Sequence, residues 1–425
     1  MIGAAILVVF AAMLIRTIRR PVVAVALLLM FFAGKQLVQL SLPVFAARGP
    51  LLSYVVFGIL GLIWIQRASR GRAERMLGIP REYAPQLFFL ALTIVSTTWS
   101  MDPYVWDHLF ERLPYLIVYA LVVPSLIAST RGINEAYQWI AWVGGAISII
   151  FLIGYPESSN ASRLVLAAET GTGDTLPLNP LAVGAMGAVT AVAAALADFP
   201  RRRLVYALRL VLATAGLLVA ARSSRGDLFA ALLVVGIFGA IPTSTGQWLQ
   251  GRRMIAALAT VVAASGVLYY GLFLTDYWSR YVNMTEDAGI LDRQEMVAGV
   301  LNYYLDHPGT WLFGSGWSSS FAIVGFYPHN GPVQALCELG LIGAATWCSS
   351  VLYILARGLR LVFLANRTRS PSLDVVRPAL GLVLCTLISN LKAGDCIDIW
   401  LCLTLATASQ LLRRFRPESE KALFR

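Results

Sequence analysis

The chain is predicted to fold as an all-α bundle of transmembrane helices, and three observations carry this prediction. Of its 425 residues, 58% are hydrophobic and only 13% are charged, and the mean hydropathy is +0.69, far from the composition of soluble domains. Apolar segments long enough to cross a bilayer as helices, about 20 residues each, recur along the whole chain. Basic residues gather in short runs between alternate segments, as they do in cytoplasmic loops.

Thirteen apolar segments are candidate spans. The first is short, so the sequence predicts twelve or thirteen spans. Because this segment lacks a basic region and a small-residue cleavage pattern before Arg16, we expect a retained span and not a removed signal peptide. Residues 1–425 are therefore predicted to form a single integral membrane domain. The segments are 2–18, 21–45, 50–66, 85–99, 113–129, 135–154, 176–198, 204–221, 227–242, 254–274, 332–356, 377–391 and 397–412.

The basic runs predict the orientation of the chain in the membrane. Under the positive-inside rule, they place one set of loops and the C-terminus in the cytoplasm. The formal net charge of +11 then reflects topology, and nucleic acid is not an expected partner. We expect a multi-pass membrane protein whose other loops form the outward face. The runs lie at 16–20, 67–75, 201–203, 252–253, 357–369 and 413–416.

One outward loop, at 275–331, is much longer than the others and is predicted to be a periplasmic insertion, since loops of this length are usually functional. Within it, residues 291–305 are expected to form an amphipathic helix at the interface. Pro308 should end this helix, and Gly314 and Gly316 should permit a tight backbone. The apolar face of the helix is expected to hold Leu291, Met296, Val300 and Tyr304.

Arg222 and Arg225 break the charge rule, because they lie in a short outward turn, Ala-Arg-Ser-Ser-Arg-Gly-Asp. Arginines there are candidates for an anion site, and their guanidinium forks suit a diphosphate. Gly226 would let a bulky anion approach the backbone. The alternative is that the arginines reach lipid headgroups or pair with Asp227.

Other charged residues on the outward side have two interpretations each. Arg293, near the start of the predicted loop helix, is either a second phosphate ligand or the partner of Asp292 or Glu295 on a solvated face. Asp395 and Asp398, in the last outward turn, either balance the charge of the arginines or belong to a simple solvated loop. The pattern of residues does not separate these alternatives.

His329 is the best catalytic candidate on chemical grounds. It is one of three histidines, and its neutral form can accept a proton near pH 7. Asn330 follows it, and Pro332 can open an apolar helix that carries Glu338 about two turns in. The alternative role for His329 is to cap that helix through its ring.

The remaining histidines and the cysteines do not predict a metal site or a cofactor. We expect His307 to be a structural turn residue and His108 to be solvated or interfacial. No pair of histidines has helical or short-loop spacing, and His-Glu-x-x-His is absent. The five cysteines show no Cys-x-x-Cys spacing and are expected to be small core residues. They are Cys337, Cys348, Cys385, Cys396 and Cys402.

Three motifs occur in the order in which one known family has them. The first is Ser224-Arg225-Gly226, and the second is Asp292-Arg293, followed by an aromatic-rich helix and Leu-Phe-Gly-Ser-Gly at 312–316. The third is Pro-His-Asn, then nine residues, then Gly340, with Glu338 inside the interval. In these motifs the chain resembles the O-antigen ligase and polymerase superfamily, which includes exopolysaccharide polymerases. The motifs cover roughly residues 205–360, and the rest is similar only in the number of spans.

The resemblance implies transfer of a whole glycan from a polyprenyl (undecaprenyl) diphosphate carrier to an acceptor hydroxyl on the periplasmic face, without a metal. It implies that His329 is the general base or positions the acceptor, and that Arg225 and Arg293 hold the diphosphate, with Arg222 added by proximity. Asn330 and Glu338 would support them. Arginines can supply the charge stabilisation that a departing diphosphate needs. Inversion at the anomeric carbon would follow if transfer is a single displacement.

The acceptor stays open, because ligation and polymerisation use the same donor and leaving group. It would be the lipid A core, another carrier-linked repeat or a protein, and surface polysaccharide is slightly favoured. The rival class is a transporter or flippase of lipid-linked oligosaccharide. A flippase should carry charges in the middle of spans and show two related halves. Here the unusual charges collect at outward ends and in one long loop, which favours an enzyme, and a passive scaffold would leave the outward arginines unexplained.

Overall fold

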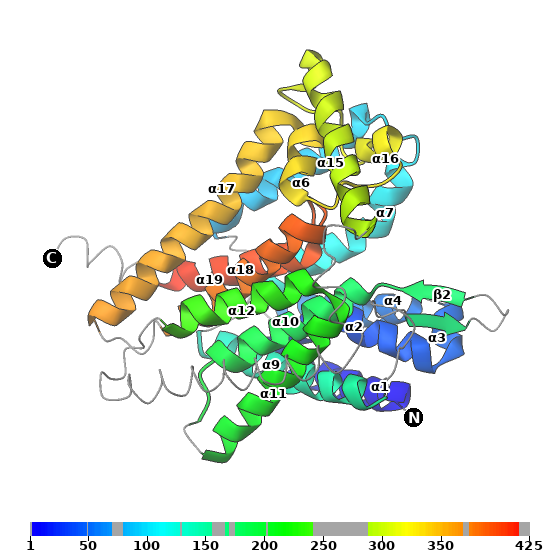
Figure 1. Ribbon diagram of the computed structural model, residues 1–425. Coiled ribbons are helices and arrows are strands. Elements are labelled where there is room, and N and C mark those ends of the chain that lie inside the picture. The colour runs from blue at the N-terminus through cyan, green and yellow to red at the C-terminus, as the bar shows by residue number, and fades with distance from the viewer. Residues whose placement is uncertain are drawn as a thin grey trace.

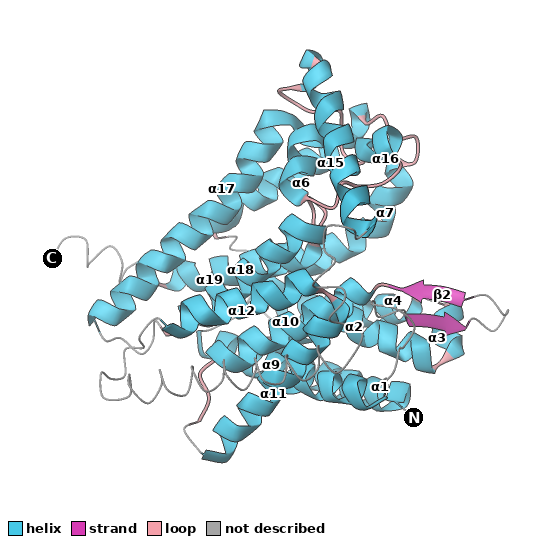
Figure 2. Cartoon of the chain, viewed as in Figure 1, coloured by secondary structure: helices cyan, strands magenta, loops and turns pink. Residues whose placement is uncertain are grey.

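The protein is a bundle of helices with one short β-hairpin, as Figures 1 and 2 show. Among the described residues of this computed structural model, five helices are long and apolar enough to cross a membrane, which confirms the predicted class of helical membrane protein. They lie at Val23–Ser41, Gly132–Gly154, Arg203–Ser223, Gly331–Ala365 and Val376–Ala393. The structure describes residues 2–48, 50–69, 80–127, 130–154, 166–169, 175–200, 203–240, 288–368 and 374–415.

Helices occupy twelve of the thirteen predicted apolar segments, and the segment at 254–274 lies outside the described residues. The segment predicted at 113–129 is built from three consecutive pieces, in which a π-helical stretch follows Pro114 inside a helix. The helices are α1 (Ile2–Arg19), α2 (Val23–Ser41), α3 (Pro43–Ala47), α4 (Leu51–Arg67), α6 (Ala84–Ser96), α7 (Val105–Leu116), the π-helix η4 (Ile117–Val122), α8 (Val123–Ser125), α9 (Thr130–Gly154), α10 (Pro180–Leu196), α11 (Arg203–Ser223), α12 (Arg225–Ala240), α15 (Ala288–Asp306), α16 (Ser319–Val324), α17 (Gly331–Thr368), α18 (Val376–Ala393) and α19 (Ile399–Arg414).

Two short strands, β1 (Leu166–Glu169) and β2 (Thr175–Leu178), form an antiparallel hairpin that the sequence did not predict. β1 lies against α2 and α3, and the hairpin projects at one end of the bundle in Figure 2. Strands of four residues carry too little periodicity to be recognised in a chain dominated by apolar helices.

The core of the bundle is centred on α10, which contacts α9, α11, α12 and α18. This helix consists largely of alanine, glycine and valine, and nearly all of its side chains are buried. Small residues let the backbones of neighbouring helices approach closely, so dispersion contacts hold the bundle together. α12 and α18 lie side by side within this core, and their ends bring the site residues together.

α17 is broken where the sequence motif has its glycine. Gly340 has φ 69° and ψ −167°, so the helix opens at this residue. The segment at 311–316 docks on the opening: Leu341 N–H donates to Trp311 O at 2.8 Å, and Gly316 N–H donates to Glu338 O at 2.8 Å. A Cβ at position 340 would overlap the backbone of the docked segment. The spacing of the motif therefore has a structural reason, because only glycine fits this position.

The helix predicted at 291–305 is present as α15. Val300 and Tyr304 are buried in a small cluster with Cys337, but Leu291 is 46% exposed. Both α16 and α17 contact α15, so the buried face of α15 is the one that packs against these two helices. The helix ends at Asp306, just before the predicted stop at Pro308. The expected tight turn is also present, with positive φ at the two glycines, Gly314 and Gly316.

Candidate functional site

The three sequence motifs meet around the C-terminal end of α18. Lys392, in its last turn, bonds the Ser224 hydroxyl through Nζ and lies 3.3 Å from Asp227 Oδ1. Asp227 is 2% exposed and also accepts from Ser389 Oγ at 2.6 Å. Gly226 packs directly against the Lys392 side chain. The turn that carries Arg222 and Arg225 is thereby fixed to α18, and Lys392 is a site residue that sequence reasoning missed.

Asn330 ties the second half of the site to the same place. Its Nδ2 donates to Leu391 O at 3.1 Å, and its Oδ1 accepts from Val333 N–H at 3.2 Å. Gly331 lies against the Asn390 side chain. Asn330 therefore caps α17, and the alternative in which His329 caps this helix is wrong.

His329 is held in an unusual backbone conformation between α18 and an aromatic pair. Its φ is 55°, in the left-handed region that disfavours residues other than glycine. The ring lies 4.4 Å from Tyr327 and 5.3 Å from Phe326, between centroids, and interacts with the Ala393 backbone. Its Nδ1 is buried and has no hydrogen-bond partner among the described residues. This nitrogen is thus an unused hydrogen-bonding atom inside the site.

Arg293 lies close enough to act on His329. Burial and, second, the positive charge of Arg293 hold the pKa of His329 below its ordinary value of 6.5, while the contact with the Ala393 backbone opposes them. Arg293 also acts electrostatically on Tyr327 and Lys392. At pH 7 the imidazole is neutral and can accept a proton. Because Arg293 and Lys392 repel each other, a bound anion would stabilise this end of the bundle.

Glu338 is fully buried and holds the loop before α16 in place. It accepts from the backbone N–H groups of Ser318 at 3.0 Å and Ser320 at 3.2 Å, and from Gln334 Nε2 at 3.1 Å. Gln334 Oε1 in turn accepts from Cys396 N–H at 3.0 Å, in the turn after α18. The carboxyl group therefore acts on the site through the loop and does not itself face an open space.

The turn after α18 is not a simple solvated loop. Asp395 is 8% exposed and forms an ion pair with Arg112 of α7. Asp398 caps α19 by accepting from Leu401 N–H at 2.8 Å. Arg112 is a partner that the sequence did not indicate, since it is almost three hundred residues away.

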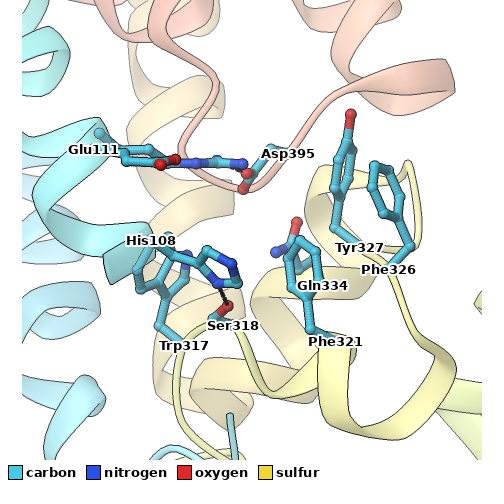
Figure 3. A pocket seen from close by; sticks show the side chains of 10 residues that line it. His108, Glu111, Trp317, Ser318, Phe321, Phe326, Tyr327, Gln334 and Asp395 are labelled. Carbon is cyan, nitrogen blue, oxygen red and sulfur yellow. Dashed lines mark hydrogen bonds and ion pairs between the residues drawn. The ribbon is translucent and has the colours of Figure 1, made fainter. Parts of the chain in front are cut away.

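A pocket of about 230 Å³ lies beside His329, and Figure 3 shows its lining. His108 faces this pocket: its side chain is 30% exposed, and its Nδ1 lies 2.9 Å from Asp102 Oδ2. His307 agrees with a structural turn role, because its Nδ1 contacts Tyr303 O at 2.8 Å. The pocket is lined by His108, Glu111, Arg112, Trp317, Ser318, Phe321, Phe326, Tyr327, Gln334 and Asp395.

The described residues include no group of three or more histidine, cysteine or acidic side chains that could hold a metal ion. All five cysteines are free thiols, and Cys348 alone among them is exposed. No protein-family model and no curated protein matches the chain. Its fold and contacts define a helical membrane protein that brings arginine, lysine and histidine side chains together at one end of its bundle.

Proposed function

We propose that the protein is a membrane glycosyltransferase that transfers a glycan from a polyprenyl diphosphate carrier to an acceptor hydroxyl, in ligation or polymerisation of surface polysaccharide. One observation carries the proposal. The turn after α11, Arg293 on α15, and the His329-Asn330 pair are far apart in the sequence but converge on the end of α18. Each belongs to a motif by which the chain resembles the O-antigen ligase and polymerase superfamily.

The chemistry of the cluster suits a diphosphate leaving group. In the proposed reaction, the acceptor oxygen bonds to the anomeric carbon as the bond from that carbon to the diphosphate breaks. His329 takes the proton of the acceptor hydroxyl, which its neutral ring permits. Arg225 and Arg293 stabilise the charge that develops on the diphosphate, with Arg222 and Lys392 adding positive charge nearby. A single displacement would invert the anomeric carbon.

The proposal places the site on the periplasmic face of a bacterial inner membrane, with twelve or thirteen spans and the C-terminus in the cytoplasm. The distribution of arginines supports this orientation. The loop at 275–331 would then lie outside the membrane and deliver α15 to the site. The glycan would come from a lipid-linked donor in the outer leaflet, and the acceptor would be a second glycan or the lipid A core.

Purified full-length protein in detergent, given a polyprenyl-diphosphate-linked oligosaccharide and candidate acceptors, tests the proposal. We expect a transferred product and free polyprenyl diphosphate, both insensitive to a chelator. Arg225→Gln and Arg293→Gln should each lower the rate on the order of 10²-fold, as loss of a transition-state donor does. Arg20→Gln is the matched control, because Arg20 only pairs with Glu135 at 2.8 Å in an exposed position.

The acceptor that carries the transferred glycan in the product would establish the class of acceptor. Normal turnover by both Arg225→Gln and Arg293→Gln would contradict a diphosphate role for the cluster. Loss of activity with the chelator would contradict a metal-independent reaction.

A further inference from the structure

The pocket beside His329 has aromatic walls, and these form a row that runs from His108 in the lining to His329 outside it. The ring of His108 lies 4.7 Å from that of Phe321, which lies 5.5 Å from Phe326. Phe326 and Tyr327 are stacked at 4.5 Å, and Tyr327 lies 4.4 Å from His329. Figure 3 shows Phe321, Phe326 and Tyr327 on one side of the pocket, with Phe326 stacked on Tyr327. A ligand in the pocket is therefore separated from His329 by one ring.

Polar groups face the aromatic walls across the pocket, and His108 is the most firmly held of them. Ser318 Oγ donates to Asp102 Oδ2 at 2.6 Å, and the same carboxylate oxygen lies 2.9 Å from His108 Nδ1. Since a carboxylate oxygen accepts, Nδ1 carries the hydrogen. The other ring nitrogen, Nε2, is left to bond a ligand. Gln334 Nε2 donates a hydrogen bond to Glu338, so the Gln334 amide is also held in one orientation.

The charges in the lining select against an acidic ligand. Arg112 is paired with Asp395 and lies 5.9 Å from the centroid of the Trp317 ring. Glu111 is the remaining charged side chain of the lining. The pocket therefore carries one net negative charge from its acidic and arginine residues, which would repel a carboxylate on the ligand.

We propose that this pocket binds one neutral pyranose, a hexose or an N-acetylhexosamine, as the acceptor-sugar subsite of the proposed transferase on which the inference rests. Aromatic rings with a few fixed polar groups are what a sugar ring needs, since its C–H face packs on a ring and its hydroxyls bond the polar groups. The volume of about 230 Å³ is smaller than that of pockets for drug-sized ligands and fits a single ring. The sugar would then lie one ring, that of Tyr327, away from His329.

Saturation-transfer NMR on the full-length protein in detergent, with methyl glycosides of glucose, galactose and N-acetylglucosamine as probes, tests the subsite without needing turnover. We expect transfer to at least one neutral glycoside and weaker transfer to methyl glucuronoside. Phe321→Ala should weaken binding about tenfold, through loss of one wall. Phe110→Ala is the matched control, because Phe110 is on α7 with His108 but is 64% exposed and outside the lining.

A second pair of variants separates this inference from the proposed function. Glu111→Gln should raise the affinity for methyl glucuronoside relative to the neutral glycosides. Arg293→Gln should lower transfer on the order of 10²-fold yet leave glycoside binding unchanged. The subsite would be overturned if no neutral glycoside bound, or if Phe321→Ala and Phe321→Leu both bound as the native protein does while unfolding at the same temperature. Donor turnover would still report on the transferase itself.

Discussion

The two non-glycine residues with positive φ in the described part of the chain are both at the site. Ser318, with φ 70°, lines the pocket, and His329, with φ 55°, lies beside Arg293. Such conformations cost about 1–3 kcal/mol each and persist only where the surroundings impose them. Glu338 imposes the first by binding Ser318 N–H, and Asn330 fixes the chain directly after the second. The strain is thus stored where the geometry of polar groups matters most.

The protonation of His329 gives the first prediction at this scale. Because burial and Arg293 lower its pKa, the neutral ring is favoured in the folded protein. Its contribution to stability is present above the ordinary pKa of 6.5 and is lost as pH falls through the lower folded value. We expect the acid limb of the kcat/KM profile to have its midpoint below 6.5. His329→Ala should abolish this limb together with most of the transfer.

NMR of the histidine side chains measures the pKa of His329 without turnover. The chain has only three histidines, so their signals can be assigned. Arg293→Gln should raise the pKa of His329 by removing a neighbouring positive charge, whereas Arg20→Gln should leave it unchanged. An unchanged pKa in Arg293→Gln would mean that the two side chains do not interact in solution.

At the scale of elements, local patterns predicted what local forces determine. The start of α17 near Pro332, the helix at 291–305 and its end before Pro308 were all predicted, because capping and periodicity act within a few residues. The break at Gly340 was not predicted. It depends on the docking of residues 311–316, a contact between segments that the sequence alone does not place together.

Gly340 therefore offers a prediction about an element. Alanine at this position would adopt a left-handed φ and would bring its Cβ within 2.3 Å of Leu312 O, so the docked segment must move. We expect Gly340→Ala to destabilise the protein by about 1–3 kcal/mol and to lower transfer. Thermal unfolding in detergent, followed by tryptophan fluorescence, measures the change. Gly236→Ala in α12 is the matched control, because its Cβ would meet nothing within 4 Å.

Equal unfolding temperatures for Gly340→Ala and Gly236→Ala would show that the segment at 311–316 does not depend on the break in α17.

At the scale of the whole molecule, the sequence supplied the reacting groups but not their neighbours. Arg225 was selected because an arginine at the end of an apolar helix needs a reason to be there, His329 for its proton chemistry, and Arg293 through the family motif. Lys392 and His108 were not selected, since their roles come from Asp227 and Asp102 with Ser318. Such pairs form when helices pack, and composition or spacing does not encode which helix ends meet.

The last prediction concerns the orientation of the bundle in the membrane. Labelling near the two ends of α17 tests it. The 28 residues that follow its break at Gly340 span about 42 Å at about 1.5 Å each, more than the hydrocarbon thickness of about 30 Å, so we expect its two ends to lie in water on opposite sides. In a Cys348→Ser background, which removes the exposed native thiol, Gly309→Cys should react with an impermeant maleimide in intact spheroplasts. Arg367→Cys should react only after permeabilisation. The reverse pattern would place the arginine and histidine cluster in the cytoplasm, where a donor in the outer leaflet could not reach it.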